Sequence, residues 1–489
     1  MKKKILLIIS FILLAIFAFN FISDDFNNQR FYKRLLPAEL KYFLKKTLFA
    51  KSLENQKLRD KIIVLESEKK ELQKKHYSLI LKLRKEILNK KNIFFEFEDT
   101  KIIKSKKKNE YQITTFITDD LFIGKNPARN PKVTAYIDLY ENKLFLVSGD
   151  GIISFIENYN DLNKQTLDFK IRESNFDSLV YKYDLYSSTY MGVKDVKIFQ
   201  NKIYLSYSDR LFDNNKCHIL SVARADLSEQ FLNFENIFSG KECGIRSDAK
   251  QLSGLYSQGG RMQFNQDFLY LTIGTFGSEL QAQNKNNYLG KVVRINLNDK
   301  IYKKIKIISM GHRNPQGMVL DNDNQYLYIT EHGPKGGDEI NFINLKNISE
   351  PLNFGWPISS YGEHVVGGKT PEEIKDMYKT MPLHKNHNKY NFIEPVYYFK
   401  NSAAISQIIK VDSNQQHLDN LYVGTLGRKN NENQHELHNF KINRKTKKVT
   451  HHDRIKINNR IRDLDYDNKS GTMIMFLETK GQIAFVKKK

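Results

Sequence analysis

The sequence is poor in cysteine and tryptophan, and both shortages narrow what the chain can be. Its 489 residues include two cysteines, Cys217 and Cys243, so at most one disulfide can form. In an oxidising compartment the two would pair and close a loop within one structural unit; otherwise they are unrelated reduced thiols. A single Trp accompanies 26 Tyr and 32 Phe, and abundant Tyr and Phe favour β-rich structure.

A strong excess of basic charge is missing from most of the chain. Residues 1–95 hold 22 Lys and Arg but 9 Asp and Glu, so they carry +13 of the formal net charge of +23. The other 394 residues carry only +10. We therefore expect no nucleic-acid-binding face and no nucleic acid partner. The basic N-terminal part suits either a membrane surface or a solvated, Lys-rich helix.

Charged residues are absent from Ile5 to Ile22, a run that follows three lysines. Its length is near the minimum for a membrane-spanning helix, so residues 1–22 are predicted to form a signal anchor. The lysines would stay in the cytoplasm, which places the rest of the chain on the periplasmic side of an inner membrane. A signal peptide cleaved near Ala18 is the alternative, and it also exports the chain.

Glycine and proline are absent from Lys51 to Lys91. Residues 23–93 are predicted to form a basic helical stalk between the membrane and the domain that follows. The stalk either self-associates as a short coiled coil or lies as one amphipathic helix on the membrane or on the domain. The coiled-coil alternative rests on leucines that recur every seven residues, at Leu58, Leu65, Leu72 and Leu79.

From about Phe94 the pattern changes to short apolar runs between turn-forming residues. A recurring unit of roughly 50–60 residues made of short strands is typical of a β-propeller. Residues 94–489 are therefore predicted to form an all-β, six-bladed β-propeller; a pair of β-sandwiches with coincidental spacing is the alternative. The longest interval holds an insertion with a short helix beginning near Pro371. The six similar runs are Leu144–Val147, Ile203–Leu205, Leu269–Leu271, Leu327–Ile329, Leu421–Val423 and Met473–Met475.

Propellers bind ligands in a central funnel, on the loops that connect strands. The segment from Gly311 to Gly317, "GHRNPQG", reads as one such loop. Arg313 offers a planar fork that suits a carboxylate or a quinone oxygen. The alternative is that Arg313 and Asn314 only hold neighbouring loops together.

Two further loops carry groups that suit ions. In "GPKGGDE", Gly333 to Glu339, glycine and proline free backbone carbonyls from regular pairing beside two acidic residues. Such an oxygen-rich segment suits Ca²⁺, although its spacing is not that of an EF-hand. Near the C-terminus, Arg460 and Arg462 are two residues apart, so on a strand they share a face and attract a polyanion. A surface salt-bridge pair is the alternative.

Taken together, these pieces resemble the soluble quinoprotein glucose/sorbosone dehydrogenase family, whose members are also called aldose sugar dehydrogenases. The likeness is strongest from Gly259 to Pro357. It implies a six-bladed propeller that binds pyrroloquinoline quinone and Ca²⁺ in its funnel and oxidises aldose sugars at the anomeric carbon. The motifs that carry it are "GGRMQFNQDFLYLTIGTFG", "GHRNPQGM", "EHGPKGGDEINFI", "NFGWP" and "NNRIRD".

Matched position by position, the resemblance also implies a set of binding residues. The carbonyls of Gly333 and Pro334 would bind the calcium that reaches the quinone. Glu339, with the backbone at Phe354, would hold a second calcium. The cofactor carries three carboxylates, which suits cationic partners. The residues implied to touch it are Arg313, Asn314, Lys410, Arg460 and Arg462.

One position departs from the family pattern. The family base is a His ahead of the "GGR" triplet, and in "GLYSQGGRM" that position is Ser257. A neutral Ser is not basic enough to take a sugar hydroxyl proton near neutral pH. Two functions therefore stay open. The chain is either a membrane-anchored, exported quinoprotein sugar dehydrogenase, whose activity Ser257 calls into question, or a non-catalytic propeller that binds a glycan or a protein.

Overall fold

The computed structural model describes most of the chain beyond residue 83. The chain divides into two compact units, Met1–His76 and Tyr77–Lys489, and the strands of the described residues lie in the second. The predicted anchor, residues 1–22, lies outside the described residues, within which no helix is long and apolar enough to cross a membrane. The described residues are 84–121, 134–180, 192–210, 217–242, 256–298, 305–321, 323–346, 348–412, 415, 417–427, 435–489 and scattered positions from 60 to 82.

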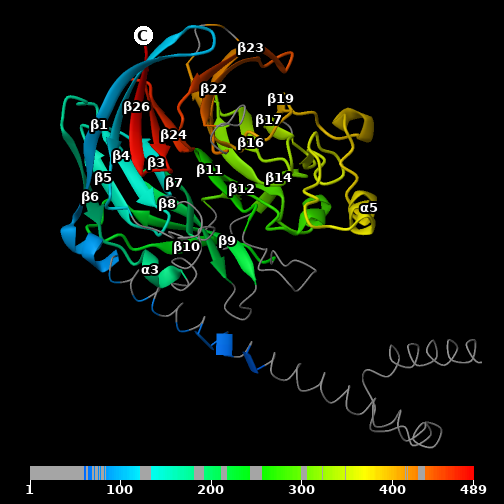
Figure 1. Cartoon of the computed structure of the whole chain (residues 1–489), viewed down its shortest axis with the longest axis horizontal. Helices are drawn as coiled ribbons and strands as arrows, with labels where there is room; N and C mark the ends of the chain where they lie inside the picture. Colours follow the sequence, from blue (N-terminus) through cyan, green and yellow to red (C-terminus); the bar gives the residue numbers. More distant parts are fainter. Residues whose placement is uncertain are drawn as a thin grey trace, which may run out of the picture. The chain divides into compact units, whose positions relative to one another are not determined.

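Six strands form a closed ring in the second unit. Figure 1 labels β3, β7, β11 and β24 among them. Each of the six contacts the next in chain order, and β24 contacts β3, which closes the ring. Each also begins a blade: β7, β11, β15 and β20 each lie at the edge of a separate sheet, and β3 and β24 are the two ends of one nine-stranded sheet within the described part of the chain. These inner strands are β3 (Ala135–Tyr140), β7 (Gly192–Phe199), β11 (Gly259–Asn265), β15 (Pro315–Leu320), β20 (Ile405–Val411) and β24 (Ile461–Asp467).

The six apolar runs seen in the sequence form the second strand of each sheet. Each pairs antiparallel with its inner strand. Both faces of these strands are covered by neighbouring sheets, which explains why the runs are continuously apolar rather than alternating. The propeller prediction is therefore confirmed, and the β-sandwich alternative is wrong. The second strands are β4 (Lys143–Ser148), β8 (Lys202–Arg210), β12 (Phe268–Ile273), β16 (Tyr326–Glu331), β21 (Leu418–Thr425) and β25 (Thr472–Leu477).

Two more strands complete each blade. The third strands are β5 (Ile153–Glu157), β9 (His218–Asp226), β13 (Lys291–Asn296), β17 (Asp338–Asn344), β22 (Glu436–Asn443) and β26 (Gln482–Lys488). The outer strands are β6 (Thr166–Arg172), β10 (Glu235–Ser239), β14 (Ile305–Met310), β19 (Tyr397–Phe399), β23 (Lys448–Lys456) and β2 (Glu110–Ile117). The two-residue strand β18 (Leu352–Asn353) runs parallel beside β14.

The ring is closed by a strand from the start of the propeller. β2 pairs antiparallel with β26, so the last blade takes its outer strand from residues more than 360 positions earlier. The long strand β1 (Asn92–Lys104) then pairs with both β2 and β6 and joins the last blade to the first. The sequence repeat did not reveal this closure, because β1 and β2 precede the first repeated run.

The hydrophobic core is divided among the contacts between blades. Each of six buried clusters in the described structure combines side chains from two neighbouring blades. For example, Phe116 of β2 and Phe476 of β25 pack with Ile137 of β3 and Leu144 of β4. Burying one such side chain contributes roughly 1.5–3 kcal/mol, and no blade could bury its faces alone.

The predicted insertion lies between β18 and β19. It contains the helix α5 (Pro371–Thr380) and the short turn η3 (His387–Tyr390). Thr370 caps α5: its hydroxyl accepts from the Glu373 backbone N–H, and the Glu373 carboxylate accepts from the Thr370 N–H. Pro371 stands at the first helical position, as predicted. Two further short helical elements are α3 (Phe176–Leu179) and η2 (Glu279–Gln283).

The end of the predicted stalk belongs to the propeller. Residues 84–90 are helical, and Ile87 is buried in the cluster between the last and first blades. The buried Arg84 guanidinium pairs with Asp150 at 2.7 Å and with Asp177 at 2.8 Å. Of the four repeating leucines only Leu65 is described, and it is 54% exposed.

One cysteine is described. Cys217, just before β9, is fully buried and disulfide-bonded. Cys243, the other cysteine of the chain, lies outside the described residues. Cys217 is therefore not a reduced thiol.

Candidate functional site

Arg261, on β11, lies where the inner strands meet. Its guanidinium donates to the Asp195 carboxylate at 3.0 Å, to that of Asp463 at 2.7 Å and to the Gln316 carbonyl at 2.7 Å. It also lies 5.0 Å from the ring centre of Tyr136. These partners come from β7, β24, β15 and β3, so one side chain connects five of the six inner strands.

Inner strands carry bulges near their starts, and the bulges direct polar side chains to a common level. Lys194 on β7, Gln316 on β15 and Arg462 on β24 are each skipped in the pairing with the second strand. The next residues on β7 and β24 are Asp195 and Asp463, which both bind Arg261. Bulges commonly re-aim a side chain beside a functional site.

Arg460 and Arg462 share one carboxylate. Their Nε atoms each donate to a different oxygen of Glu478, both at 2.6 Å. Glu478 is fully buried, and burial alone would raise the pKa of its carboxyl, but Arg462 and Arg460 hold that pKa at about 2. Arg460 also donates to the carbonyls of Leu426 and Gly427. The structure thus brings these two predicted residues together on one face.

Arg313 and Asn314 lie just before β15 and meet His332. Arg313 Nη1 donates to the carbonyls of His332 and Gly333 at 3.3 and 2.9 Å. Its buried Nε has no hydrogen-bond partner, and the guanidinium lies 5.4 Å from the ring centre of Trp356. Asn314 Nδ2 lies 3.3 Å from His332 Nδ1.

His332 marks the point where the predicted arginines converge. Its Nε2 lies 2.7 Å from the Ile405 carbonyl; donation there leaves Nδ1 to accept from the Asn314 amide. Burial, followed by the charges of Arg313, Arg462 and Arg460, lowers the pKa of His332 to about 3. The ring is therefore neutral near pH 7, and the charges of three guanidinium groups act on it.

Ser257 lies directly before β11, in a constrained turn. Its φ of 60° is in the left-handed region, and the residue is 5% exposed. Its carbonyl accepts from the Phe276 N–H at 2.9 Å. Gly274 approaches so closely that a Cβ at residue 274 would overlap the Ser257 carbonyl oxygen. The position that the family pattern gives to its base is therefore well packed.

Lys194 was not selected from the sequence. It is the third residue of β7 and lies beside Gly260 of β11, where a Cβ would overlap the Lys194 Cβ. Burial and the charge of Arg462 lower the pKa of the Lys194 amine to about 7. An amine of this kind is partly uncharged at neutral pH.

The loop predicted to bind calcium is held by Asp338. Its buried carboxylate accepts from the Gly333 N–H at 2.9 Å and from the N–H groups of Ala403 and Ala404 at 2.8 and 2.6 Å. Burial raises the pKa of Asp338 to about 6 despite these bonds. The Gly333 carbonyl faces Arg313, whereas Pro334 packs against Gly362.

Glu339 lies in a separate acidic group. Asn341 Nδ2 donates to Glu331 at 2.7 Å and to Glu339 at 3.3 Å, so one amide bridges two carboxylates. His387 Nε2 is 3.6 Å from Glu339, and burial followed by Glu331 raises the pKa of Glu339 well above its usual value. Phe354 is buried and stacks on His312 rather than on these groups. Among the described residues, no three Asp, Glu, His or Cys side chains are arranged as a metal-binding group.

Lys410 lies away from the other residues that were predicted to bind the cofactor. Its ammonium pairs with Asp419 at 3.2 Å, and Asp419 also pairs with Arg444 and accepts from Tyr328. Lys410 is five residues beyond Ile405, the start of β20, or about 16 Å along a strand. The charge of Lys410 is thus used at the other end of its inner strand.

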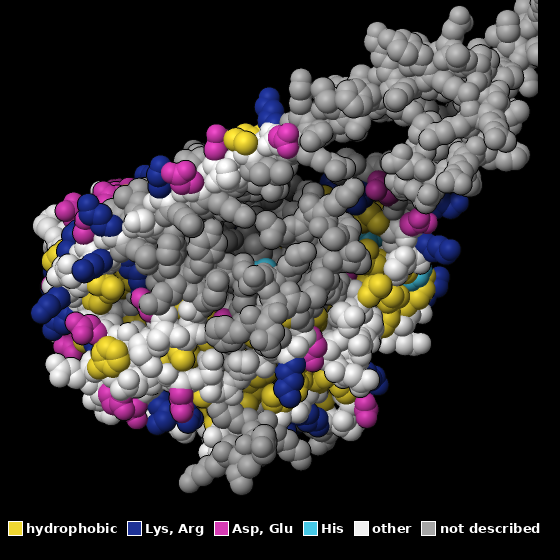
Figure 2. Space-filling view, turned by 90° about the horizontal axis from the view of Figure 1, so that it is seen from below, with side chains coloured by type: hydrophobic (Ala, Val, Ile, Leu, Met, Phe, Trp, Pro, Cys, Tyr) yellow, Lys and Arg dark blue, Asp and Glu magenta, His cyan; other side chains and the backbone are white. Residues whose placement is uncertain are grey.

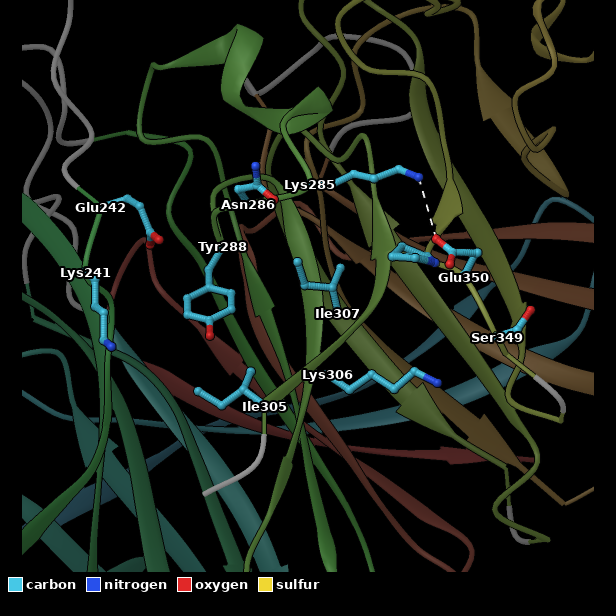
Figure 3. A pocket seen from close by; sticks show the side chains of 11 residues that line it. Lys241, Glu242, Lys285, Asn286, Tyr288, Ile305, Lys306, Ile307, Ser349 and Glu350 are labelled. Carbon is cyan, nitrogen blue, oxygen red and sulfur yellow. Dashed lines mark ion pairs between the residues drawn. The ribbon is translucent and has the colours of Figure 1, made fainter. Parts of the chain in front are cut away.

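Two surface pockets lie away from this cluster. One, of about 550 Å³, lies beside β14; Figure 3 shows the Lys285–Glu350 ion pair, 3.6 Å long, across its rim. The other, of about 740 Å³, lies between β19 and β23. Neither contains a predicted site residue. Figure 2 shows basic and acidic side chains interspersed among the coloured residues of the face it presents.

The glucose/sorbosone dehydrogenase family matches residues 173–485, more than half of the chain. The chain belongs to the glucose/sorbosone dehydrogenase family. Aldose sugar dehydrogenase YliI of Escherichia coli (strain K12) is 28% identical over 239 residues, 46% of this chain and 58% of that protein. Quinoprotein glucose dehydrogenase B of Acinetobacter calcoaceticus is 38% identical over 87 residues, 16% of this chain and 17% of that protein.

The chain thus matches less than two thirds of the length of these curated relatives. Solved structures extend the likeness to the fold. The soluble aldose sugar dehydrogenase from Escherichia coli, in its apo form, aligns with a TM-score of 0.54 at 22% identity over 77% of this chain and 100% of that chain. A glucose dehydrogenase structure aligns with a TM-score of 0.53 at 20% identity over 73% and 99%.

Family membership does not identify all of the cluster. Arg261 stands in the quoted "GGR" motif, yet a sequence does not show which arginine is buried between two carboxylates. Glu478 and Lys194 lie outside every motif that was recognised. The signal for Lys194 was a charged residue in "GVKDVKIF", a run that otherwise reads as a buried strand.

Proposed function

We propose that the chain is an exported, membrane-anchored aldose dehydrogenase that binds pyrroloquinoline quinone at the starts of its inner strands. The observation that carries this proposal is the convergence of Arg313, Arg460 and Arg462 on the neutral ring of His332. Three guanidinium groups at one end of a propeller suit a ligand with three carboxylates. The printed names of the two curated relatives, an aldose sugar dehydrogenase and a quinoprotein glucose dehydrogenase, support the same reading.

The residues present fit the quinone. Arg313 Nε is buried without a partner, so one N–H donor is available to a ligand. Arg460 and Arg462 each use Nε on Glu478 and Nη1 on other protein oxygens, so the Nη2 donors remain for a ligand. Hydrogen bonds to charged groups contribute about 1.5–3 kcal/mol each. Lys410 is not among the proposed quinone-binding residues, because its ammonium is paired with Asp419.

Calcium is proposed at the two predicted places, and the donors differ. At Glu339, the carboxylate is repelled by that of Glu331, and the buried Asn341 Oδ1 has no hydrogen-bond partner. A divalent cation bound to these oxygens would relieve the repulsion. The Phe354 backbone is the further donor implied there. At the inner place, the donors are the carbonyls of Gly333 and Pro334, because the Asp338 oxygens are occupied by backbone N–H groups.

The bound quinone would supply the acceptor for the hydride that leaves C1 of the sugar. The chain's own groups do the rest. Arg313, Arg460 and Arg462 fix the ligand's orientation, while Asn314 holds the His332 ring in place. Arg261 and its two carboxylates are buried between the inner strands and hold these strands together.

Export and anchoring rest on separate observations. Residues 1–22 are the proposed anchor, and the part of the predicted stalk before Arg84 is the proposed self-associating segment. The disulfide at Cys217 supports an oxidising compartment, because disulfides persist outside the cytoplasm. An aldose or a glycan end is the proposed substrate.

One observation favours a second function. Ser257 occupies the position of the family base, so the same funnel would serve as a non-catalytic glycan- or protein-binding site if no other group takes the proton.

The test is reconstitution of the full-length chain in detergent with pyrroloquinoline quinone and Ca²⁺. We expect aldose-dependent reduction of an artificial dye, lost in Arg460→Gln/Arg462→Gln. Cofactor binding without turnover on any aldose would support the non-catalytic function instead. Absence of cofactor binding would contradict the proposal.

A further inference from the structure

One aromatic side chain on the outer strand of the fourth blade is open to solvent. Tyr398 is the middle residue of β19, and it is 43% exposed. Its neighbours Tyr397 and Phe399 point to the opposite face, because side chains alternate along a strand. Tyr397 packs on Phe440 of the next blade, with ring centres 4.9 Å apart, and Phe399 is buried. Tyr398 therefore lies outside the core that these two blades share.

A stack of rings holds the Tyr398 ring in place. Tyr361 lies against it face to face, with ring centres 3.8 Å apart and planes 3° apart. His387, which is buried, stacks on Tyr361 with ring centres 5.2 Å apart. The Tyr361 hydroxyl donates to Glu394 at 2.8 Å, and that carboxylate also accepts from the Asn388 N–H at 3.0 Å. The stack is thus anchored at its buried end, and the face of Tyr398 that Tyr361 does not cover is open.

The open ring borders a pocket of about 740 Å³ between β19 and β23, both labelled in Figure 1. Sites for small ligands commonly have volumes of about 300–1,000 Å³. The lining offers hydrogen-bond donors and acceptors from the Lys400 ammonium, the Asn401 amide and the Glu394 carboxylate. Arg454, also in the lining, pairs with Glu436 at 3.7 Å. The pocket therefore combines an aromatic face with polar groups whose charges are close to balanced.

A pyranose ring matches this combination. The C–H groups on one side of such a ring are slightly positive and pack on the negative face of an aromatic ring. Its hydroxyls both donate and accept hydrogen bonds, as the polar groups of the lining require. A wholly apolar ligand would leave those groups unpaired, and a polyanion would need an excess of cations.

We propose that the Tyr398 pocket binds a pyranose unit of a glycan, as a second sugar site separate from the funnel. The residues implied to touch the quinone or calcium do not line it. Because Tyr361 already fixes the ring of Tyr398, little side-chain freedom is lost when a sugar stacks there. The inference does not depend on the quinone or on turnover.

The first test places a reporter in the pocket itself. In the full-length chain, in a detergent without a sugar headgroup, 3-fluorotyrosine replaces Tyr398 and its ¹⁹F resonance is followed without quinone. The probes are the methyl glycosides of glucose, galactose, mannose and N-acetylglucosamine, and we expect a saturable shift with at least one of them. A fluorophenylalanine in place of Phe231, which is 42% exposed, is the matched control and should not shift.

Three outcomes of this test would overturn the inference. They are no shift at 398 with any glycoside, equal shifts at 398 and 231, and a shift with adenosine, a flat aromatic ligand, but with no glycoside.

The second test asks whether the ring of Tyr398 is the contact. Tyr397 also lines the pocket, so 3-fluorotyrosine in its place reports binding in variants of Tyr398. Tyr398→Ala should weaken the glycoside by at least about fivefold, whereas Tyr398→Phe, which keeps the ring face, should bind within about twofold of the natural chain. A thermal melt checks that each variant is folded. Unchanged affinity in Tyr398→Ala, or loss in Tyr398→Phe equal to that in Tyr398→Ala, would overturn the inference, while failure to bind quinone would contradict only the proposed function.

Discussion

At the residue scale, the cluster depends on carboxylates that neutralise buried cations. Glu478 holds Arg460 and Arg462, while Asp195 and Asp463 hold Arg261. Breaking such a group leaves a charge buried without its partner, which costs more than an exposed ion pair is worth. These acids therefore position the cationic face even though none is expected to touch a ligand.

Glu478 should make stability depend on pH in acid. The folded-state pKa of about 2 lies below the ordinary value, so the stabilisation is complete above about pH 4.5 and is lost as pH falls toward 2. The stabilisation is on the order of 3 kcal/mol near neutral pH. In thermal melts from pH 6 to pH 3, the gap in Tm between the natural chain and Glu478→Gln should narrow. A gap that stays constant with pH would refute the role of Glu478.

Substitution of Arg261 should lower the unfolding free energy more than substitution of an exposed arginine. Arg261→Met leaves Asp195 and Asp463 buried without a cation, and we expect a loss of about 3–5 kcal/mol in unfolding free energy. Arg224→Gln is the control, because Arg224 pairs with the 64%-exposed Glu235 and should cost at most about 1 kcal/mol. Equal losses in a denaturant titration would show that Arg261 does not connect the blades.

At the element scale, the starts of the inner strands are shaped by bulges and close backbone contacts. The turn before β11 is one case, since Ser257 has a positive φ and its carbonyl abuts Gly274. Any side chain at 274 must push that turn away. The geometry at Ser257 is thus set by β12 and the residues after it as much as by its own loop.

Gly274→Ala should therefore distort the site. The added methyl would overlap the Ser257 carbonyl, and we expect a loss of about 1–3 kcal/mol or more, together with weaker quinone binding. Gly367→Ala is the matched control, since a Cβ there has no atom within 4 Å. Equal stability and equal ligand affinity of the two variants would contradict the close packing.

Elements with a local signal were predictable from the sequence. The six second strands are buried on both faces, so their apolar runs are recognisable in the sequence. The helix at Pro371 is recognisable because its capping residues and its Pro stand at the expected positions. Lys410 shows the opposite case. A loose motif match suggested cofactor binding, but the Lys410 ammonium forms an ion pair with Asp419, nine residues later on the neighbouring strand β21. Pairing between strands decides this, and one stretch of sequence does not reveal it.

At the scale of the whole molecule, function depends on closing the ring. The N-terminal strand β2 completes the last blade, which carries Arg460 and Arg462, and β1 then joins that blade to the first. The repeat count indicated six blades, yet the closure and the central role of Arg261 are relations between distant blades. A single repeat carries no sequence pattern for either relation, so only the structure reveals them.

The most direct test of the central claim, that the arginines at the strand starts bind pyrroloquinoline quinone, uses Trp356. This is the only Trp of the chain, and its ring centre lies 5.4 Å from the Arg313 guanidinium. Pyrroloquinoline quinone is titrated into the full-length chain with Ca²⁺ present, and Trp fluorescence is corrected for absorption with free N-acetyltryptophanamide. We expect saturable quenching at one cofactor per chain, with at least about tenfold weaker binding in Arg460→Gln/Arg462→Gln, the loss of about 1.4 kcal/mol or more. Quenching that never saturates, or an affinity unchanged in the double variant, would contradict the claim.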